Sequence, residues 1–166
     1  IEACKFDLDL RPVDVKDILE QGLRLNMLQA AKKDIHLDVQ SEPEFPRMII
    51  DPSKIEQVIT NLVSNAIEHT FPNTKVVVRL AAENGQVNFE VIDQGPGIPE
   101  NELNKLFKPF EKTSVKKTGG EKSTGLGMLI TRKIIEAHKG DIWVESKVNE
   151  GTHIRFTLPI KGTAHA

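Results

Sequence analysis

The chain of 166 residues has a single cysteine, no long hydrophobic run and no excess of basic residues. One cysteine, Cys4, excludes an internal disulfide framework and is typical of a reducing compartment, so we expect a cytoplasmic domain. The apolar runs fall well short of the roughly 20 residues that a transmembrane helix needs, and no signal-peptide pattern is present. A net charge of −2 indicates that nucleic acid is not the partner, and we expect no direct membrane contact.

Internal repeats, low-complexity tracts and long linkers are also absent, while 39% hydrophobic residues are enough for a sizeable core. The chain begins at Ile1 rather than at a methionine, so we expect it to be a fragment of a longer protein. Residues 1–160 are expected to form a single domain, followed by a disordered tail at residues 161–166.

Hydrophobic periodicity predicts strands and helices in alternation. Alternating or short apolar runs predict strands at residues 4–10, 35–39, 47–50, 74–82, 86–93, 141–146 and 152–158. Helices are predicted from Asp14 to about Lys33, from Asp51 to about Thr70, after Pro99, and from about Leu126 to His138. The apolar stripe of the first helix is assigned to Ile18, Leu19, Leu23 and Met27.

Glu83-Asn84-Gly85 between two predicted strands is typical of a hairpin turn. Interleaved helices and hairpins together favour an α+β fold. We expect a two-layer α/β sandwich, in which a mixed, mostly antiparallel sheet of about five strands packs on three helices.

Four short motifs carry the chemistry, and each of them is weak by itself. They are Asn61 to Ala66, Asp93 to Ile98, Phe107 to Phe110, and Thr124 to Gly127. Asn61 and Asn65 lie four residues apart on the second helix, so both amides emerge on the same face. An amide oxygen is a hard ligand suited to a Mg²⁺ ion that already carries phosphate oxygens. The alternative is that both amides bond to neighbouring backbone.

Asp93 stands at the end of a predicted strand, where its carboxylate can accept a hydrogen bond from an exocyclic amine such as that of adenine. Gly95 and Gly97 follow, and they allow the backbone to turn and to approach a flat ring closely. The alternative is a simple turn after a strand, which Asp, Gly and Pro all favour.

Gly125 and Gly127 lie at the start of the third long helix, where free backbone N–H groups and the helix dipole favour a phosphate. Residues 111–124 have few apolar side chains and are interpreted as a mobile lid over the nucleotide. Lys112, Lys116 and Lys117 can pair with phosphates, or belong to a solvated basic loop. Phe107 and Phe110 are expected to anchor the base of the lid.

In this order the motifs resemble the N box, first glycine box, F box and second glycine box of sensor histidine kinases, and the similarity extends through Gly151-Thr152. The resemblance implies a Bergerat-type ATP-binding fold, shared with DNA gyrase, a heat-shock chaperone family and the MutL repair proteins. It implies ATP and Mg²⁺ as cofactors, with Asn65 ligating the metal and Asp93 reading adenine. The nucleotide-binding residues that it implies are Asn65, His69, Asp93, Gly95, Gly97, Ile98, Phe107, Phe110, Lys112, Thr124, Gly125, Leu126, Gly127 and Thr152.

Three positions depart from the family's pattern. Lys112 stands where the family often has an arginine, Glu68 where a lysine is common, and His69 where an aromatic residue is usual. Asn61 stands where the related ATPases carry a glutamate that activates water. An amide cannot act as a general base at neutral pH, which argues against a hydrolase and fits a kinase that holds ATP intact.

The phosphoacceptor of such a kinase is missing from this chain. None of the five histidines stands in the family's acceptor context, a histidine followed by an acidic residue; they are His36, His69, His138, His153 and His165. We therefore expect the fragment to bind ATP without phosphorylating itself. The resemblance implies transfer of the γ-phosphate to a histidine on a dimerisation domain, then to a response-regulator receiver domain, within a homodimeric full-length kinase. A superfamily ATPase, a related serine kinase and a non-catalytic scaffold are the alternatives.

Overall fold

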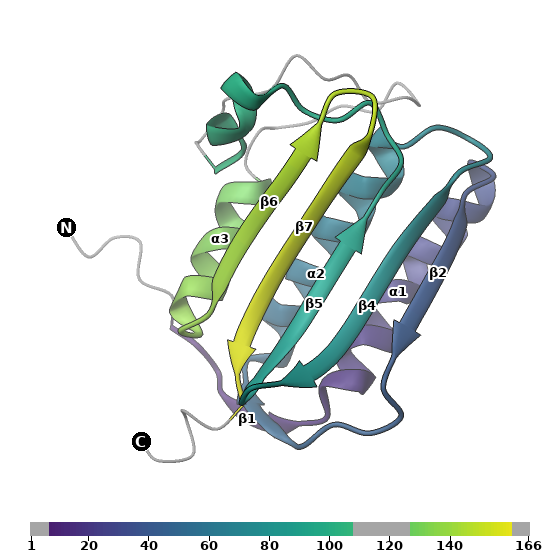
Figure 1. Cartoon of the computed structure of the whole chain (residues 1–166). Coiled ribbons are helices and arrows are strands. Elements are labelled where there is room, and N and C mark those ends of the chain that lie inside the picture. The colour runs from purple at the N-terminus through teal and green to yellow at the C-terminus, as the bar shows by residue number, and fades with distance from the viewer. Residues whose placement is uncertain (1–6, 108–126, 161–166) are drawn as a thin grey trace.

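A computed structural model of the chain describes residues 7–107 and 127–160. In chain order its elements are β1 (Arg11–Val13), α1 (Val15–Lys32), β2 (His36–Ser41), β3 (Met48–Ile50), α2 (Pro52–His69), β4 (Lys75–Glu83), β5 (Gln86–Ile92), the 3-10 helix η2 (Glu100–Phe107), α3 (Gly127–Ala137), β6 (Asp141–Lys147) and β7 (Gly151–Pro159). Figure 1 shows two layers, with the sheet in front and α1, α2 and α3 packed behind it.

The main sheet has five strands in the order β2-β4-β5-β7-β6. Only the β2–β4 pair is parallel, and the other three pairs are antiparallel. The predicted fold class, a mixed and mostly antiparallel sheet on three helices, is therefore confirmed. A second sheet, in which β1 pairs antiparallel with β3, was not predicted.

The core lies between the two layers, because each strand directs alternate side chains toward the helices. In β5 the buried positions alternate strictly, and Phe89 packs against Phe156 of β7 with ring centroids 5.0 Å apart. The largest buried side chains from the helices are Leu19, Ile55, Ile59, Leu62, Ile67, Ile134 and Ile135. The hairpin prediction is confirmed as well, because Asn84 and Gly85 both have positive φ, at 54° and 74°, as a type I′ turn requires.

Two predictions about the N-terminal part were wrong. Residues 7–10 of the predicted strand 4–10 are not in a strand, and the pairing strand begins only at Arg11. Residues 1–6 of that prediction lie outside the described residues. Met27 is 52% exposed, because the seam of α1 against α2 is completed by the polar Asn26 instead. Periodicity alone did not reveal that a polar residue would take a core position.

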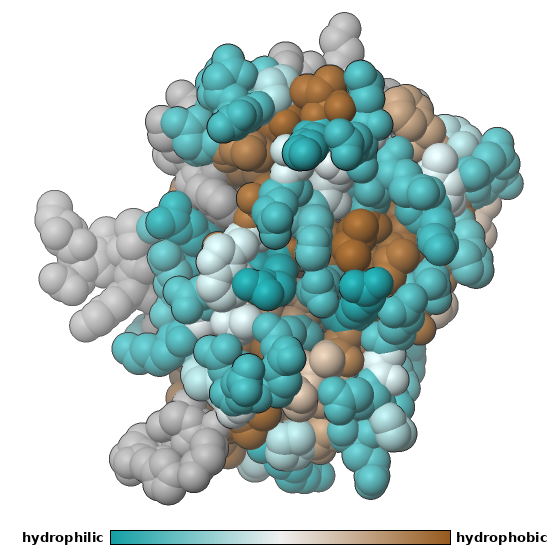
Figure 2. Space-filling model, in the orientation of Figure 1, coloured by the Kyte–Doolittle hydropathy of each residue, from teal (hydrophilic) through white to brown (hydrophobic). Residues whose placement is uncertain are grey.

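The outer face of the sheet carries a row of polar and charged side chains across the strands. Arg155 lies over the ring of Trp143 at 4.5 Å, and His153 pairs with Glu90 at 2.7 Å. Figure 2 shows this face as mostly hydrophilic, with smaller apolar areas between the polar side chains. No helix within residues 7–107 and 127–160 is long and apolar enough to span a bilayer. The chemistry-bearing motifs lie elsewhere, at one end of the sheet.

A buried histidine joins α3 to the start of α2. His138 Nε2 accepts a hydrogen bond from the backbone N–H of Asp51 at 3.0 Å, while its Nδ1 donates to Ile134 O at 2.8 Å. The Asp51 carboxylate caps α2 through the N–H of Lys54 and also accepts the N–H of Asp9. Burial lowers the pKa of His138, outweighing the opposing effect of the Ile134 hydrogen bond.

We expect this junction to destabilise the fold in mild acid. A histidine whose folded pKa is depressed binds a proton more readily in the unfolded chain, so stability is lost as pH falls below about 6.5. The free energy of unfolding should fall by up to about 1.4 kcal/mol per pH unit in this window. Urea unfolding at pH 7.5 and 5.0 should show a smaller loss in His138→Gln than in the unmodified chain. His36→Gln, at an exposed position, is the control; an equal loss in all three proteins would contradict the prediction.

Candidate functional site

Asn61, Asn65 and His69, spaced four residues apart, form a polar row on α2, each partly exposed and lying beside the stripe of buried residues. His69 Nδ1 donates to the backbone oxygen of Asn65 at 2.8 Å, which fixes the ring and leaves Nε2 for another partner. Within the described residues, neither asparagine amide makes a side-chain hydrogen bond. The amide oxygens of Asn61 and Asn65 are therefore not engaged by neighbouring backbone.

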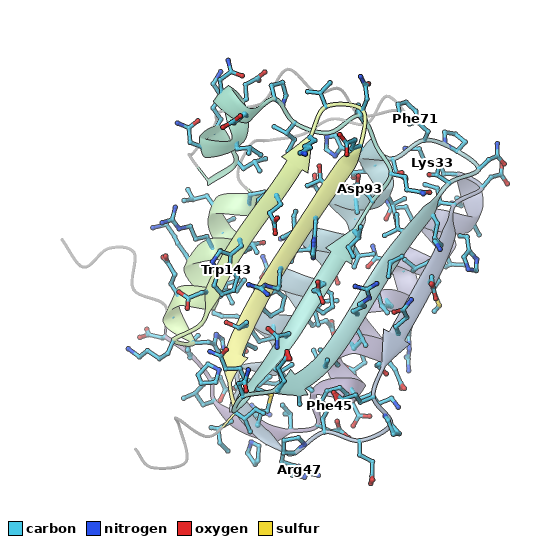
Figure 3. All side chains as sticks on the ribbon, viewed as in Figure 1. Lys33, Phe45, Arg47, Phe71, Asp93 and Trp143 are labelled. Atoms are coloured by element: carbon cyan, nitrogen blue, oxygen red, sulfur yellow. The ribbon has the colours of Figure 1, made fainter. Side chains whose placement is uncertain are left out.

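Asp93 directly follows β5 and is buried, with 8% of its surface exposed (Figure 3). Its Oδ1 accepts the backbone N–H groups of Gly95 at 2.9 Å and Thr152 at 3.1 Å. Both hydrogen bonds from the described residues fall on this one oxygen, so Oδ2 is the atom left for a ligand donor. Burial raises the pKa of Asp93, against the opposing effects of these two N–H groups and of nearby His69.

The loop after Asp93 is shaped by two glycines that admit no side chain. A Cβ at Gly95 would lie 2.6 Å from the backbone oxygen of His69. Gly97 has φ +76°, and a Cβ there would overlap the backbone oxygen of Lys147. The glycines of this motif thus allow the loop to approach α2 on one side and β6 on the other.

The end of β6 and the turn that follows it hold the same loop through two hydrogen bonds. Asn149 N donates to Pro96 O at 2.7 Å, and Ile98 N donates to Ser146 Oγ at 2.8 Å. The backbone of Thr152 also contacts that of Asp93, because Asp93 N donates to Thr152 O at 2.9 Å. Sequence reasoning found Thr152 but missed Ser146 and Asn149. No local signal marks them, because the loop residues that they contact, Ile98 and Pro96, lie about 50 residues away along the chain.

The end of α2 is also held in place, by residues that the sequence did not indicate. Lys33 Nζ donates to the backbone oxygens of Ile67 and Glu68, both at 2.9 Å, and so satisfies carbonyls at the helix C-terminus. Gln94 N donates to Thr70 Oγ1 at 3.2 Å, which joins this helix end to the loop after Asp93. The polar row and the Asp93 loop are therefore fixed relative to each other.

The predicted site residues fall into three groups. The structure brings together those on α2, the Asp93 loop and the start of β7, namely Asn65, His69, Asp93, Gly95, Gly97, Ile98 and Thr152. Phe107 ends η2 and Gly127 begins α3, with no described atom within 4 Å of a Cβ added at Gly127. Phe110, Lys112, Thr124, Gly125, Leu126 and the predicted lid 111–124 lie outside the described residues.

Comparison with known proteins gives consistent matches. Residues 50–162 match the family model described as histidine kinase-, DNA gyrase B-, and HSP90-like ATPase. The chain is 34% identical over 163 residues to the circadian input-output histidine kinase CikA of Synechococcus elongatus, covering 96% of this chain and 21% of CikA. It is 33% identical over 158 residues to the adaptive-response sensory kinase SasA of Synechocystis, covering 94% of this chain and 40% of SasA. The chain thus spans between a fifth and two fifths of these curated relatives.

Solved structures agree in fold. The nucleotide-free catalytic domain of histidine kinase ThkA is 33% identical with a TM-score of 0.79, covering 92% of this chain and 97% of that domain. Full-length ShkA in complex with AMPPNP is 26% identical with a TM-score of 0.80, covering 93% of this chain and 32% of ShkA. ThkA in complex with the response regulator TrrA is 29% identical with a TM-score of 0.75, covering 91% of this chain and 42% of ThkA.

Proposed function

This chain belongs to the family of histidine kinase-, DNA gyrase B- and HSP90-like ATPases, and from that premise we propose that it is the ATP-binding catalytic domain of a two-component sensor histidine kinase. In this proposal residues 1–160 are one domain of a longer, homodimeric kinase. The domain binds Mg-ATP and presents the γ-phosphate to a histidine on a dimerisation domain outside this chain. The phosphoryl group then passes to the receiver domain of a response regulator.

The observation that carries the proposal is the buried Asp93. Its Oδ1 accepts two backbone N–H groups, and its Oδ2 has no hydrogen-bond donor among the described residues. A carboxylate oxygen at the mouth of a glycine-shaped loop suits the exocyclic amine of adenine, because that amine donates and a carboxylate only accepts. Gly95 and Gly97 allow the loop to pack closely against His69 and Lys147, so a flat base can lie over it without meeting a side chain at these positions. The complex of ShkA with AMPPNP supports a nucleotide at this fold.

Asn65 fits a metal shared with phosphate. The described residues contain no cluster of three His, Cys, Asp or Glu side chains that could hold a metal. The amide oxygen of Asn65, which no described residue engages, is a hard donor of the kind that Mg²⁺ takes beside phosphates and waters. When bound, Mg²⁺ would supply charge neutralisation for phosphoryl transfer, while the chain supplies positioning.

Asn61 distinguishes transfer from hydrolysis in the proposal. It lies one helical turn before Asn65 on the same face of α2. By the resemblance, this is the position at which the related ATPases carry a water-activating glutamate. A neutral amide cannot take up the proton of water, so the domain should hold ATP intact until its acceptor arrives. The response regulator as final acceptor is supported by the complex of ThkA with TrrA.

The proposal is tested by titrating the chain with AMPPNP by calorimetry, with and without Mg²⁺. In Asn65→Asp we expect an affinity loss of about tenfold or more without Mg²⁺, because an added carboxylate repels the phosphates. With saturating Mg²⁺ the loss should be several-fold smaller, since the carboxylate then ligates the ion. Asn88→Asp, with the same charge change on β5, is the matched control and should show no Mg²⁺-dependent difference.

Other outcomes would favour the alternatives. Absence of AMPPNP binding by the unmodified chain would leave the scaffold as the better interpretation. Steady phosphate release from ATP by the isolated chain would favour an ATPase. Phosphate on a serine rather than on a histidine of a partner would favour a serine kinase.

A further inference from the structure

We propose that Ser146, on β6, is a positioning residue for base recognition, which turns Thr152 into an acceptor beside Asp93 and so selects a 6-amino purine over a 6-oxo purine. The inference rests on the proposed nucleotide site and deepens it. Ser146 belongs to none of the four motifs, and its hydroxyl is engaged entirely by the elements that surround the Asp93 loop.

The Ser146 hydroxyl has three partners. Ile98 N donates to its Oγ at 2.8 Å, its own hydrogen is donated to Gly151 O at 3.0 Å, and Thr152 Oγ1 lies 2.8 Å away. These contacts tie the loop after Asp93 to the start of β7 through one oxygen. Ser146 is partly buried, so solvent does not readily replace a lost partner.

By distance alone either oxygen of the Ser146–Thr152 contact could be the donor, and we assign the direction from the other two partners of Ser146. A serine hydroxyl has one hydrogen and two lone pairs. With the hydrogen given to Gly151 O and one lone pair taken by Ile98 N, only the second lone pair is left for Thr152. In this assignment, Thr152 Oγ1 donates its hydrogen to Ser146 and keeps only lone pairs for any ligand.

Thr152 lies immediately beside the base-reading carboxylate. Its backbone N–H donates to Asp93 Oδ1 at 3.1 Å, and its backbone oxygen accepts from Asp93 N at 2.9 Å. With Thr152 Oγ1 polarised as an acceptor, the side chains of Asp93 and Thr152 offer two acceptors to a ligand, Asp93 Oδ2 and that hydroxyl oxygen. A 6-amino purine, or a water that it holds, can donate here, whereas a 6-oxo group would bring a further acceptor against them.

The test compares the β,γ-imido analogues of ATP and ITP, which differ in the 6-amino and 6-oxo groups of the base. Calorimetry with Mg²⁺ would give both dissociation constants for the unmodified chain, Ser146→Ala, Ser146→Thr and Ser41→Ala. Ser41→Ala is the matched control. It removes the hydroxyl of the last residue of β2, whose partner is the backbone oxygen of the next residue, Glu42. Thermal unfolding of each variant would monitor folding.

In Ser146→Ala the Thr152 hydrogen is released and can turn toward the ligand, so the preference for the ATP analogue should shrink by about tenfold. Ser146→Thr keeps the hydroxyl and should restore the preference, and Ser41→Ala should leave it unchanged. A purely structural role would weaken both analogues equally, and that result would overturn the inference while leaving the proposed function standing. Binding of neither analogue by the unmodified chain would overturn the proposed function, and the inference with it.

Discussion

Asp93→Asn is expected to lower the affinity for AMPPNP by about 100-fold while leaving the fold intact. The asparagine can keep its Oδ1 on the N–H groups of Gly95 and Thr152, because an amide oxygen accepts as a carboxylate does. Its NH₂ group then occupies the place of Oδ2 and faces the adenine amine, donor against donor. Loss of a hydrogen bond to a charged group, with a buried donor left unpaired, corresponds to about 100-fold in affinity.

The measurement is calorimetric titration with AMPPNP and Mg²⁺, accompanied by thermal unfolding. Asp38→Asn, on β2, makes the same charge change away from the loop and should bind like the unmodified chain. Asp93→Asn should unfold at an equal or higher temperature at neutral pH. Full affinity in Asp93→Asn would contradict the assignment of Asp93 as the base-reading group, and a lower unfolding temperature would mean that the loop itself was disturbed.

The same variant tests the raised pKa of Asp93. Because the folded pKa lies above that of an unfolded aspartate, burying the ionised carboxylate costs stability at pH values above the folded pKa. Below the pKa of the unfolded chain the group is protonated in both states, and the cost vanishes. The stability advantage of Asp93→Asn should therefore be present at neutral pH and disappear in acid.

The helical and strand framework could be predicted from the sequence because its causes are local. Asp14 and Asp51 cap the helices through N–H groups two and three residues away, and Asn84-Gly85 forms its turn from its own dihedral preferences. The pairing of β1 with β3 is different, since Arg11 faces Ile50 only because the tertiary fold brings them together. The three residues of β1 carry little apolar periodicity, whereas the equally short β3 was recognisable from its run of apolar residues.

The candidate site divides in the same way. Motif residues such as Asn65, Asp93 and Gly97 could be named because their chemistry and spacing are visible along the chain. The residues that hold them, Lys33 and Ser146, do so through contacts with residues 34 to 48 positions away along the chain. Nothing in a serine within a strand indicates that its hydroxyl will receive the N–H of Ile98, 48 residues earlier.

Gly97→Ala is expected to abolish nucleotide binding and to destabilise the fold more than a positive φ alone would. The position has φ +76°, which costs an L-residue about 1–2 kcal/mol. In addition, the new methyl group would overlap the backbone oxygen of Lys147, so either the loop or the β6–β7 turn must move. Overpacking of this kind adds about 1–3 kcal/mol, and moving the loop displaces Ile98 from Ser146.

Gly85→Ala separates the two contributions, because Gly85 has a nearly identical φ of +74° with nothing within 4 Å of the added Cβ. It should lose only about 1–2 kcal/mol in urea unfolding and bind AMPPNP normally, since the β4–β5 turn lies at the opposite end of the sheet from Asp93. Gly97→Ala should lose more stability than Gly85→Ala and at least about 100-fold in affinity. If the two variants behaved alike, the close packing of the Asp93 loop against β6 would not be what requires glycine at position 97. The loop's shape would then have to follow from φ alone, and the bracing by the β6–β7 turn would lose its role in nucleotide binding.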